Sequence, residues 1–346
     1  MAADLRVALV GYGLAGRVFH APLIGATPGL RLHTVVSSDA GKVHADLADV
    51  RVVATPQAAF DDPAIDLVVI AAPNDTHAPL AIAALQAGKH VVVDKPFAID
   101  LAQARSVAEA ARMSDRLLTV FHNRRWDADF LALAALVDSG TLGEIAEVHS
   151  HFDRFRPDVP NRWRERAGPG AGLWLDLGPH LVDQTLQLFG MPDAVQADIA
   201  IQRAGAEVDD WFHVVLRYPR LRVVLHAGAL VPGAGLRFAV HGTGGSWFKH
   251  GLDPQEAALR EGTLPGGEGW GVDPSLGRLL RVHDDGTIIE DASPAPAGDY
   301  HAFYAGVRDA IRGDAAPPVT LDEALDVMRV LQAGVDSAAS GHIVAP

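Results

Sequence analysis

The sequence predicts an α/β protein of two domains, with a parallel sheet in the first and a large, mostly antiparallel open sheet in the second. Three observations predict this fold class. The 346 residues suit two domains of roughly 150 residues each. Up to about Phe121, short apolar runs alternate with longer helical patterns, which is typical of βαβ units. Beyond Phe121, strand-like runs follow one another with short connections, which is typical of antiparallel strands.

The first domain is expected over residues 1–121. Its predicted strands are short runs of consecutive apolar residues, as in strands that are buried on both faces, and they lie at 5–10, 32–36, 67–71, 90–93 and 117–121, with a weaker candidate at 51–54. Helical patterns at 78–86 and 101–112 lie between them. Right-handed crossovers would place the loops that follow the strands at one edge of the sheet, where open α/β folds bind ligands.

The second domain is expected over residues 122–346. It opens with a helical pattern at 127–138, and its strand-like runs lie at 145–152, 194–202, 211–218, 222–227 and 236–241. A segment rich in glycine and proline at 262–277 is expected to form a long loop. Two helices are expected at the end of the chain, near 300–312 and 321–339, and Thr320 is the expected N-cap of the second.

Composition excludes several classes of protein. The chain has 29 basic and 43 acidic residues, a net charge of −14, which argues against nucleic acid or an anionic membrane as a partner. The absence of cysteine excludes disulfides, iron–sulfur clusters and a cysteine nucleophile. No apolar run approaches the ~20 residues of a membrane span. The first residues show no secretory signal, so we expect a cytoplasmic protein.

A glycine-rich turn directly follows the first predicted strand. It reads Gly11-Tyr12-Gly13-Leu14-Ala15-Gly16 and leads into a helix. Glycines at this spacing allow a tight turn, close approach to a pyrophosphate, and helix–strand packing, while the helix N-terminus favours an anion. The sequence therefore predicts an N-terminal Rossmann domain that binds a nicotinamide dinucleotide through residues 11, 13, 14, 15 and 16.

The choice between NAD and NADP is expected at the end of the second strand, where an acid binds the ribose hydroxyls in NAD enzymes. Ser37 and Ser38 occupy this place, followed by Asp39, and Lys42 is close by. Hydroxyl groups leave room for a 2′-phosphate that Lys42 could reach, which favours NADP. Asp39 could equally bind the ribose diol if the strand ends later.

Further polar residues follow the fourth and fifth strands at the same edge. Asp94-Lys95-Pro96 ends the fifth strand, and Pro96 restricts Lys95 and could be cis. We expect Pro73, Asn74, His77, Asp94 and Lys95 to contact the cofactor. Later in the chain, Asp176 and His180 are four residues apart and would share one face of a helix. Pro179 complicates this, because it would kink that helix or begin it.

These residues together resemble the Gfo/Idh/MocA oxidoreductase family over essentially the whole chain. The family's E-K-P signature appears as Asp94-Lys95-Pro96, and its D-x-x-x-H pair as Asp176 and His180. The stretches 122–127 and 162–165 resemble a narrower branch, the bacterial NADP-dependent scyllo-inositol dehydrogenases. The resemblance implies a small polyol or sugar substrate and a C-terminal domain that binds this substrate and assembles homodimers or homotetramers.

The implied mechanism needs a base, charge stabilisation at the reacting oxygen, and a hydride acceptor. We assign His180 as general acid/base, Lys95 as hydrogen-bond donor to the reacting oxygen, and Asp176 as the residue that orients the pair, although Lys95 could instead take the proton. The residues expected to bind substrate are Asn123, Arg154, Trp163, Asp176 and His180.

Other interpretations remain open from the sequence. The arginines at 124, 125, 154, 156, 162, 164 and 166 would line the substrate site or, more simply, form ion pairs. His149 and His151 share a strand face, but the histidines are otherwise scattered and we expect no catalytic metal. The rival functions are a non-catalytic dinucleotide-binding sensor and an NAD-dependent glycoside-cleaving enzyme.

Overall fold

The computed structural model describes residues 3–160, 165–283 and 285–346, and the chain divides into two compact units. The first comprises residues 1–123, 255–270 and 299–325, and the second comprises 124–254, 271–298 and 326–346. The first unit is therefore assembled from three segments of the chain, whereas the sequence pattern suggested one continuous domain over 1–121.

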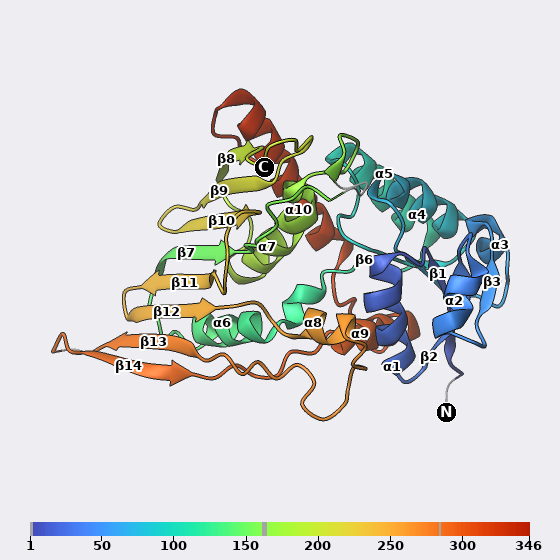
Figure 1. The fold of residues 1–346 in the computed structure, drawn as a ribbon, viewed down its shortest axis with the longest axis horizontal. Coiled ribbons are helices and arrows are strands. Elements are labelled where there is room, and N and C mark those ends of the chain that lie inside the picture. Colours follow the sequence, from blue (N-terminus) through green and yellow to red (C-terminus); the bar gives the residue numbers. More distant parts are fainter. Residues whose placement is uncertain (1–2, 161–164, 284) are drawn as a thin grey trace. The chain divides into compact units, whose positions relative to one another are not determined.

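The first unit contains a parallel sheet of six strands in the order β3-β2-β1-β4-β5-β6 (Figure 1). Its strands are β1 (Leu5–Val10), β2 (Leu30–Val36), β3 (Arg51–Val53), β4 (Leu67–Ile70), β5 (His90–Val93) and β6 (Leu118–Val120). The order reverses direction at β1, as in doubly wound folds, so the neighbouring ends of β1 and β4 form the topological switch point. The predicted parallel sheet is confirmed.

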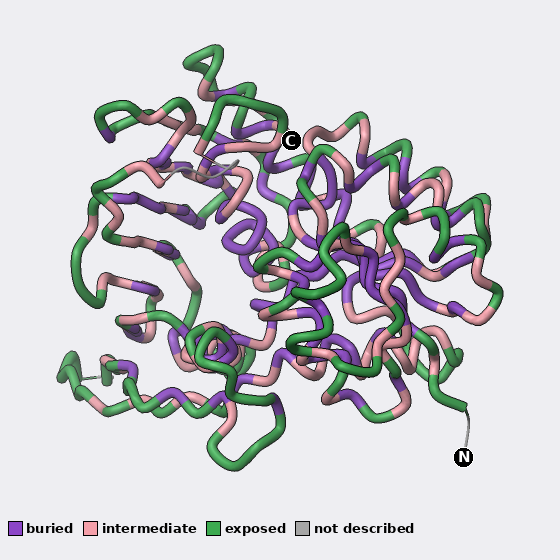
Figure 2. The backbone as a smooth tube through the Cα atoms, turned by 45° about the vertical axis from the view of Figure 1, so that its right-hand side comes forward, coloured by how far each residue is buried: buried purple, intermediate pink, exposed green. Residues whose placement is uncertain are grey.

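Helices connect these strands. They are η1 (Gly16–His20, one π-helical turn), α1 (Ala21–Ala26), α2 (Ala40–Asp46), α3 (Pro56–Phe60), η2 (Asn74–Thr76), α4 (His77–Gln86) and α5 (Leu101–Ser114), with α8 (Gln255–Arg260) and α9 (His301–Arg312) contributed by the later segments. The central strands β1, β4 and β5 are buried almost throughout, since helices cover both faces of the sheet (Figure 2). This explains why their sequences are continuous apolar runs.

The second unit contains a sheet of eight strands in the order β14-β13-β12-β11-β7-β10-β9-β8. Its strands are β7 (Ile145–His151), β8 (Ala194–Ala200), β9 (Trp211–Arg217), β10 (Arg222–Gly228), β11 (Leu236–Gly242), β12 (Gly245–His250), β13 (Gly277–Val282) and β14 (Ile288–Ser293). All neighbouring pairs are antiparallel except β7 and β10. The expected open, mostly antiparallel sheet is confirmed.

The helices of this unit lie on one face of the sheet (Figure 1). They are α6 (Ala128–Asp138), α7 (Leu173–Phe189) and the C-terminal part of α10 (Leu321–Ser340), and the short turn η3 (Asn123–Trp126) precedes α6. The buried indole of Trp174 on α7 donates to Leu331 O of α10 at 3.1 Å. The other face of the sheet is left open, so its strands alternate between buried and partly exposed residues, as β9 does throughout.

Two details of the helix ends follow expectation. Thr320 and Glu323 form a capping box at the start of α10, since Glu323 N–H donates to Thr320 Oγ1 and Thr320 N–H donates to the Glu323 carboxylate. No helix among the described residues is long and apolar enough to cross a membrane.

Candidate active site

The glycine turn after β1 forms a cradle with one open side. A Cβ at Gly11, where φ is +97°, would lie 2.5 Å from Ala71 O, and one at Gly16 would lie 2.2 Å from Gly11 O. Both positions therefore exclude any side chain. A Cβ at Gly13 would meet no protein atom within 4 Å. The cradle is closed by Gly11 and Gly16 and open at Gly13. A pyrophosphate can therefore approach the backbone at Gly13 and the first turn of the helix, which begins at Leu14 and Ala15.

The end of β2 supplies the residues expected to select the cofactor. Ser37 Oγ accepts a hydrogen bond from the N–H of Asp39, and the exposed Ser38 lies between them. Asp39 is the N-cap of α2, because its carboxylate accepts from Lys42 N–H at 2.9 Å. The sequence left open whether Asp39 binds a ribose diol. In the structure one of its carboxylate oxygens accepts the hydrogen bond that caps α2. The Lys42 side chain is exposed.

Asp94 and Lys95 follow β5 at the carboxyl edge of the sheet, and the Lys95–Pro96 peptide is cis. The Asp94 side chain is buried, accepts from Lys95 N–H at 2.8 Å, and lies 3.7 Å from His20 Nε2. Burial favours the neutral acid, but the adjoining His20, Lys95 and His77 outweigh this and lower the pKa of Asp94 to about 2. A buried, ionised carboxylate therefore lies directly behind Lys95.

A tyrosine from α9 completes this network. Tyr304 Oη lies 2.7 Å from His20 Nδ1, and both side chains are fully buried. Burial and the nearby Asp94 raise the pKa of Tyr304 well above its ordinary value, so Tyr304 stays a neutral phenol. The contacts from Tyr304 to His20 and from His20 to Asp94 thus connect α9 and η1 to the segment that carries Lys95.

The residues that follow β4 occupy the same edge. Pro73 is exposed, whereas Asn74 begins η2 and is buried. His77, which was expected to contact the cofactor, is buried, and its two ring nitrogens lie 2.8 Å from Pro96 O and 3.0 Å from Ala72 O. Its imidazole therefore joins the loop after β4 to the loop after β5, which positions the Lys95–Pro96 turn.

In the second unit, Asp176 and His180 lie on one continuous helix. α7 runs from Leu173 to Phe189 through Pro179, so the predicted shared face is formed despite the proline. The helix begins at Gly172, whose φ is +99° and where a Cβ would lie 1.9 Å from Asp209 Oδ1. Asp209 accepts from Trp174 N–H at 2.7 Å and caps the helix from a distant segment. Burial raises the pKa of Asp209, although hydrogen bonds from backbone N–H groups, among them those of Trp174 and Leu173, lower it.

The end of β7 packs beside these two residues. Arg154 Nη1 lies 3.8 Å from Asp176 Oδ2, and the Arg154 guanidinium stacks over the Phe152 ring at 4.9 Å. His180 is buried and its ring is nearly parallel to that of Phe152, with 6.5 Å between centroids. The helix and the strand end thus bring together an imidazole, a carboxylate and a guanidinium, groups that can exchange a proton and bind hydroxyls.

Two further arginines of the 124–166 stretch are buried and form ion pairs. Arg124 pairs with Asp127 at 3.3 Å and stacks over Phe152 at 4.6 Å, and Arg125 forms a two-armed pair with Asp183. Asn123 is buried in η3. Trp163, together with Arg162 and Arg164, lies outside the described residues.

Four residues of this geometry had no signal in the sequence. They are His20, Tyr304, Phe152 and Asp209. Their partners lie elsewhere in the sequence; His20 and Tyr304, for example, are 284 residues apart. None belongs to a motif, and only the fold brings each to its partner.

The glycine cradle, the doubly wound sheet and the residues at its carboxyl edge define a dinucleotide-binding oxidoreductase. The chain belongs to the Gfo/Idh/MocA oxidoreductase family: residues 5–122 match its NAD-binding Rossmann fold and residues 134–345 match its C-terminal alpha/beta domain. The resemblance seen in the sequence is thereby confirmed. The match to the family's NAD-binding Rossmann fold supports a nicotinamide dinucleotide as the class of cofactor.

Relatives cover nearly the whole chain. The uncharacterized oxidoreductase YdgJ of Escherichia coli strain K12 is 51% identical over 98% of this chain and 97% of its own length. The scyllo-inositol 2-dehydrogenase (NADP(+)) IolW of Bacillus subtilis strain 168 is 39% identical over 96% and 93%, respectively. Among solved structures, that of the YPO2259 oxidoreductase from Yersinia pestis is 49% identical, with a TM-score of 0.96 over 100% of this chain and 98% of that one.

The open side of the cradle can be tested with alanine at Gly13. Because a Cβ there meets no protein atom within 4 Å, the variant should fold normally. The added methyl group would instead stand in the path of the pyrophosphate. We expect Gly13→Ala to raise the Kd for NADPH at least ~10-fold, about 1.4 kcal/mol, measured by nucleotide fluorescence. Gly25→Ala is the matched control, because its Cβ also meets no atom within 4 Å; equal affinities of the two variants would contradict the assignment.

The low pKa of Asp94 predicts a dependence of stability on pH. Since the folded-state pKa of about 2 lies below the unfolded value, the ionised group stabilises the fold above pH ~4, and this contribution is lost as the pH falls toward 2. Asp94→Asn should lower the free energy of unfolding by about 2 kcal/mol at pH 7, and the difference from wild type should shrink below pH 4. Urea unfolding at several pH values measures this, with the exposed Asp75→Asn as control; a difference that is constant down to pH 3 would refute the account.

Proposed function

We propose that this oxidoreductase is an NADP-preferring dehydrogenase that oxidises a secondary alcohol of a cyclic polyol or sugar, with scyllo-inositol as the reference substrate. The observation that carries the proposal is the side-chain set at α7 and β7, where His180, Asp176 and Arg154 offer a proton acceptor, a carboxylate and a hydroxyl-binding cation. The relative IolW, a scyllo-inositol 2-dehydrogenase (NADP(+)), supports the substrate class and the coenzyme.

In the proposed mechanism, a nicotinamide dinucleotide bound at the glycine cradle supplies the hydride acceptor. Lys95 donates a hydrogen bond to the reacting oxygen and stabilises the negative charge that develops on it. Its backbone is held by Asp94, which accepts from Lys95 N–H, and by the His77 bridge to Pro96 O. The backbone that carries the lysine is therefore fixed, which limits the reorganisation that the reaction requires.

His180 takes the proton of the hydroxyl group in this proposal. The buried ring is held against Phe152, so it presents its nitrogens in a defined direction. Asp176, one turn earlier on α7, orients the substrate and His180 and is itself paired with Arg154. Asn123, Arg154 and Trp163 remain the proposed contacts to the substrate hydroxyls.

The preference for NADP is proposed from the end of β2. One Asp39 oxygen is occupied by the N-terminus of α2, which leaves Ser37, Ser38 and the exposed Lys42 beside the place of the ribose. A lysine and two hydroxyl groups suit a 2′-phosphate, whereas an NAD site needs an acid free to accept from the diol. The homodimer or homotetramer and the cytoplasmic location stay predictions.

Turnover is tested by following reduced nicotinamide with cyclitols and aldoses in excess, using both coenzymes. A net gain of absorbance with a polyol supports the proposal; a sensor would give none, and a glycoside-cleaving enzyme would release sugar without net reduction. Lys95→Met and His180→Ala should each lower kcat by at least ~100-fold and leave the Kd for NADPH within a few-fold of wild type. His241→Ala, on the open face of the sheet, is the control. Near-wild-type turnover in both variants would remove these residues from the mechanism.

The role of Lys42 gives a second prediction. Lys42→Met should raise the Kd for NADPH by about 10-fold, because one charge-assisted contact to the 2′-phosphate is lost, and should leave the Kd for NADH unchanged. Fluorescence titration with both coenzymes measures the ratio. A wild-type protein that binds NADH more tightly than NADPH would overturn the preference.

A further inference from the structure

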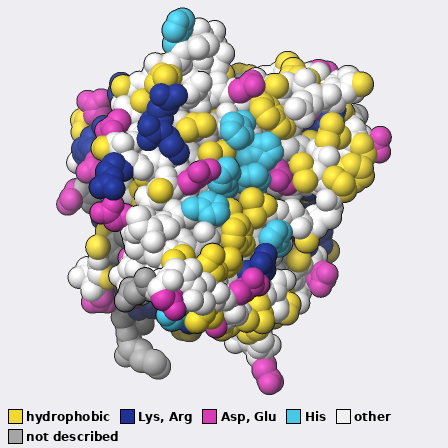
Figure 3. Space-filling view, turned by 90° about the vertical axis from the view of Figure 1, so that its left-hand side faces the viewer, with side chains coloured by type: hydrophobic (Ala, Val, Ile, Leu, Met, Phe, Trp, Pro, Cys, Tyr) yellow, Lys and Arg dark blue, Asp and Glu magenta, His cyan; other side chains and the backbone are white. Residues whose placement is uncertain are grey.

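Histidines gather on the open face of the eight-stranded sheet (Figure 3). The other face is covered by α7, whose Trp174 contacts Phe212 of β9. Strand pairing explains the cluster. His226 on β10 is directly opposite His151 on β7 and also opposite His213 on β9, so the three form a row across adjacent strands. Adjacent rings in this row lie close, with centroids 4.9 Å apart for His151 and His226 and 5.8 Å apart for His213 and His226.

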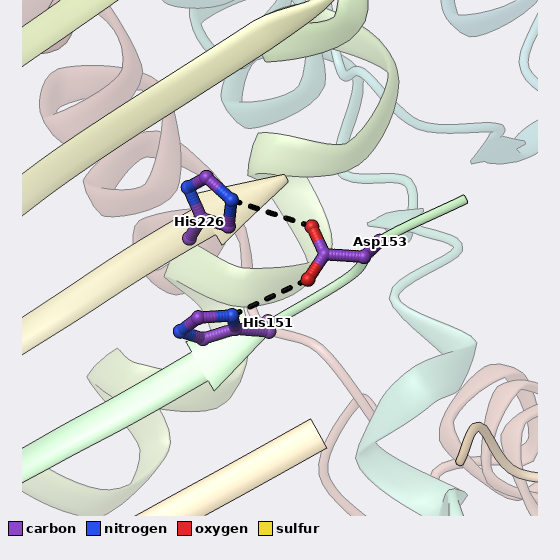
Figure 4. Close-up of side chains that lie close together, drawn as sticks. All are labelled: His151, Asp153 and His226. Atoms are coloured by element: carbon purple, nitrogen blue, oxygen red, sulfur yellow. Dashed lines mark hydrogen bonds and ion pairs between the residues drawn. The ribbon is translucent and has the colours of Figure 1, made fainter. Parts of the chain in front are cut away.

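A carboxylate lies at the end of this row. Asp153 follows β7 by two residues and so points to the same face as His151 (Figure 4). Its Oδ2 lies 3.4 Å from His151 Nδ1, and its Oδ1 lies 3.4 Å from His226 Nε2. Gly228 N–H donates to Oδ1 at 2.9 Å and fixes the carboxylate in this position.

These spacings suit coordination better than hydrogen bonding. Ring nitrogens usually donate to carboxylates at about 2.7–2.9 Å, so the contacts here are long. Zinc binds nitrogen and oxygen ligands at about 2.0–2.2 Å, which places two ligands of a tetrahedral site about 3.4 Å apart. The three donor atoms, His151 Nδ1, His226 Nε2 and an Asp153 oxygen, all lie within 4.8 Å of one another. Since two ligand atoms of one zinc ion can be at most about 4.4 Å apart, small rotations of these side chains would bring all three donors to one ion.

The buried charge of the Asp153 carboxylate also favours a bound cation. The Asp153 side chain is only 8% exposed, and within the described chain its ion-pair partners are these two histidines alone. A buried carboxylate is stable only when it is paired with a cation or a full set of donors.

We propose that His151, Asp153 and His226 bind one divalent transition-metal ion, Zn²⁺ by preference, with water at the remaining position. Two imidazoles and one carboxylate are a donor set that zinc commonly takes in a chain without cysteine. The site is distinct from Asp176 and His180, because α7 packs on the opposite face of the sheet, where its Trp174 contacts Phe212 of β9.

The position gives the ion a structural role. Residues alternate at the end of β7, so His151 and Asp153 face the metal while Phe152 and Arg154 contact His180 and Asp176 on the other face. The ion would hold the strand end to β10, beyond the hydrogen bonds from Phe152 N–H to His226 O and from Arg154 N–H to Gly228 O. This inference about binding does not depend on the proposed substrate or coenzyme.

The test uses the full chain without an affinity tag, stripped with a chelator and dialysed. We expect calorimetry to detect one equivalent of Zn²⁺ per chain, Co²⁺ to give the visible absorption of a tetrahedral site, and Zn²⁺ to raise the Tm. His151→Gln, Asp153→Asn and His226→Gln should each weaken Zn²⁺ binding at least ~10-fold. Thermal melts without metal establish that each variant is folded.

Two controls locate the ion. His241→Gln makes the same substitution on the same face outside the cluster and should leave Zn²⁺ binding unchanged. His180→Gln should also leave it unchanged, which excludes ligation at α7. Absence of Zn²⁺ binding at micromolar concentration, equal binding by the His226 and His241 variants, or loss of binding with His180→Gln would each overturn the proposal.

Discussion

The buried charge of Asp94 is the constraint on which the first unit depends most. A carboxylate that is 6% exposed must be compensated by neighbouring groups, and here these come from three segments: His20 after the glycine turn, His77 after β4, and Lys95. The two histidines are held by further contacts, His20 by Tyr304 and His77 by two carbonyl oxygens. Compensation of one charge thus fixes the loops at the edge where the dinucleotide and the reacting groups are expected.

The second unit depends on alternation along one strand. Because successive residues of an extended chain face opposite sides, the residues at and just beyond the end of β7 contact two different groups of side chains. The even-numbered Phe152 and Arg154 contact α7, and the odd-numbered His151 and Asp153 belong to the histidine cluster. A movement of this strand end would change both, so a contact on the open face can influence His180 without touching it.

Local sequence predicted the parts of this protein that local physics decides. Continuous apolar runs predicted the buried strands of the first unit, and residue types predicted Gly11, Lys95 and the Asp176–His180 spacing. The strands β12 to β14 were not predicted, because β13 and β14 are largely exposed and lack a strong apolar pattern. The return of residues 255–270 and 299–325 to the first unit, and partners such as Asp209 and Tyr304, depend on contacts between distant segments.

The arginines show why charge counting alone misleads. Arg237 on β11 is 1% exposed and reaches three elements: its guanidinium donates to Asp129 on α6 at 3.1 Å, Ser150 on β7 at 3.0 Å and Gln184 on α7 at 2.6 Å. These bonds use three different nitrogens of one planar group, whereas the three N–H donors of a lysine ammonium share a single nitrogen and cannot span the same partners. Since Gln184 lies one turn beyond His180, this buried guanidinium helps to fix the helix that carries the proposed base. A net charge of −14 is therefore compatible with interior positions where a cation is indispensable.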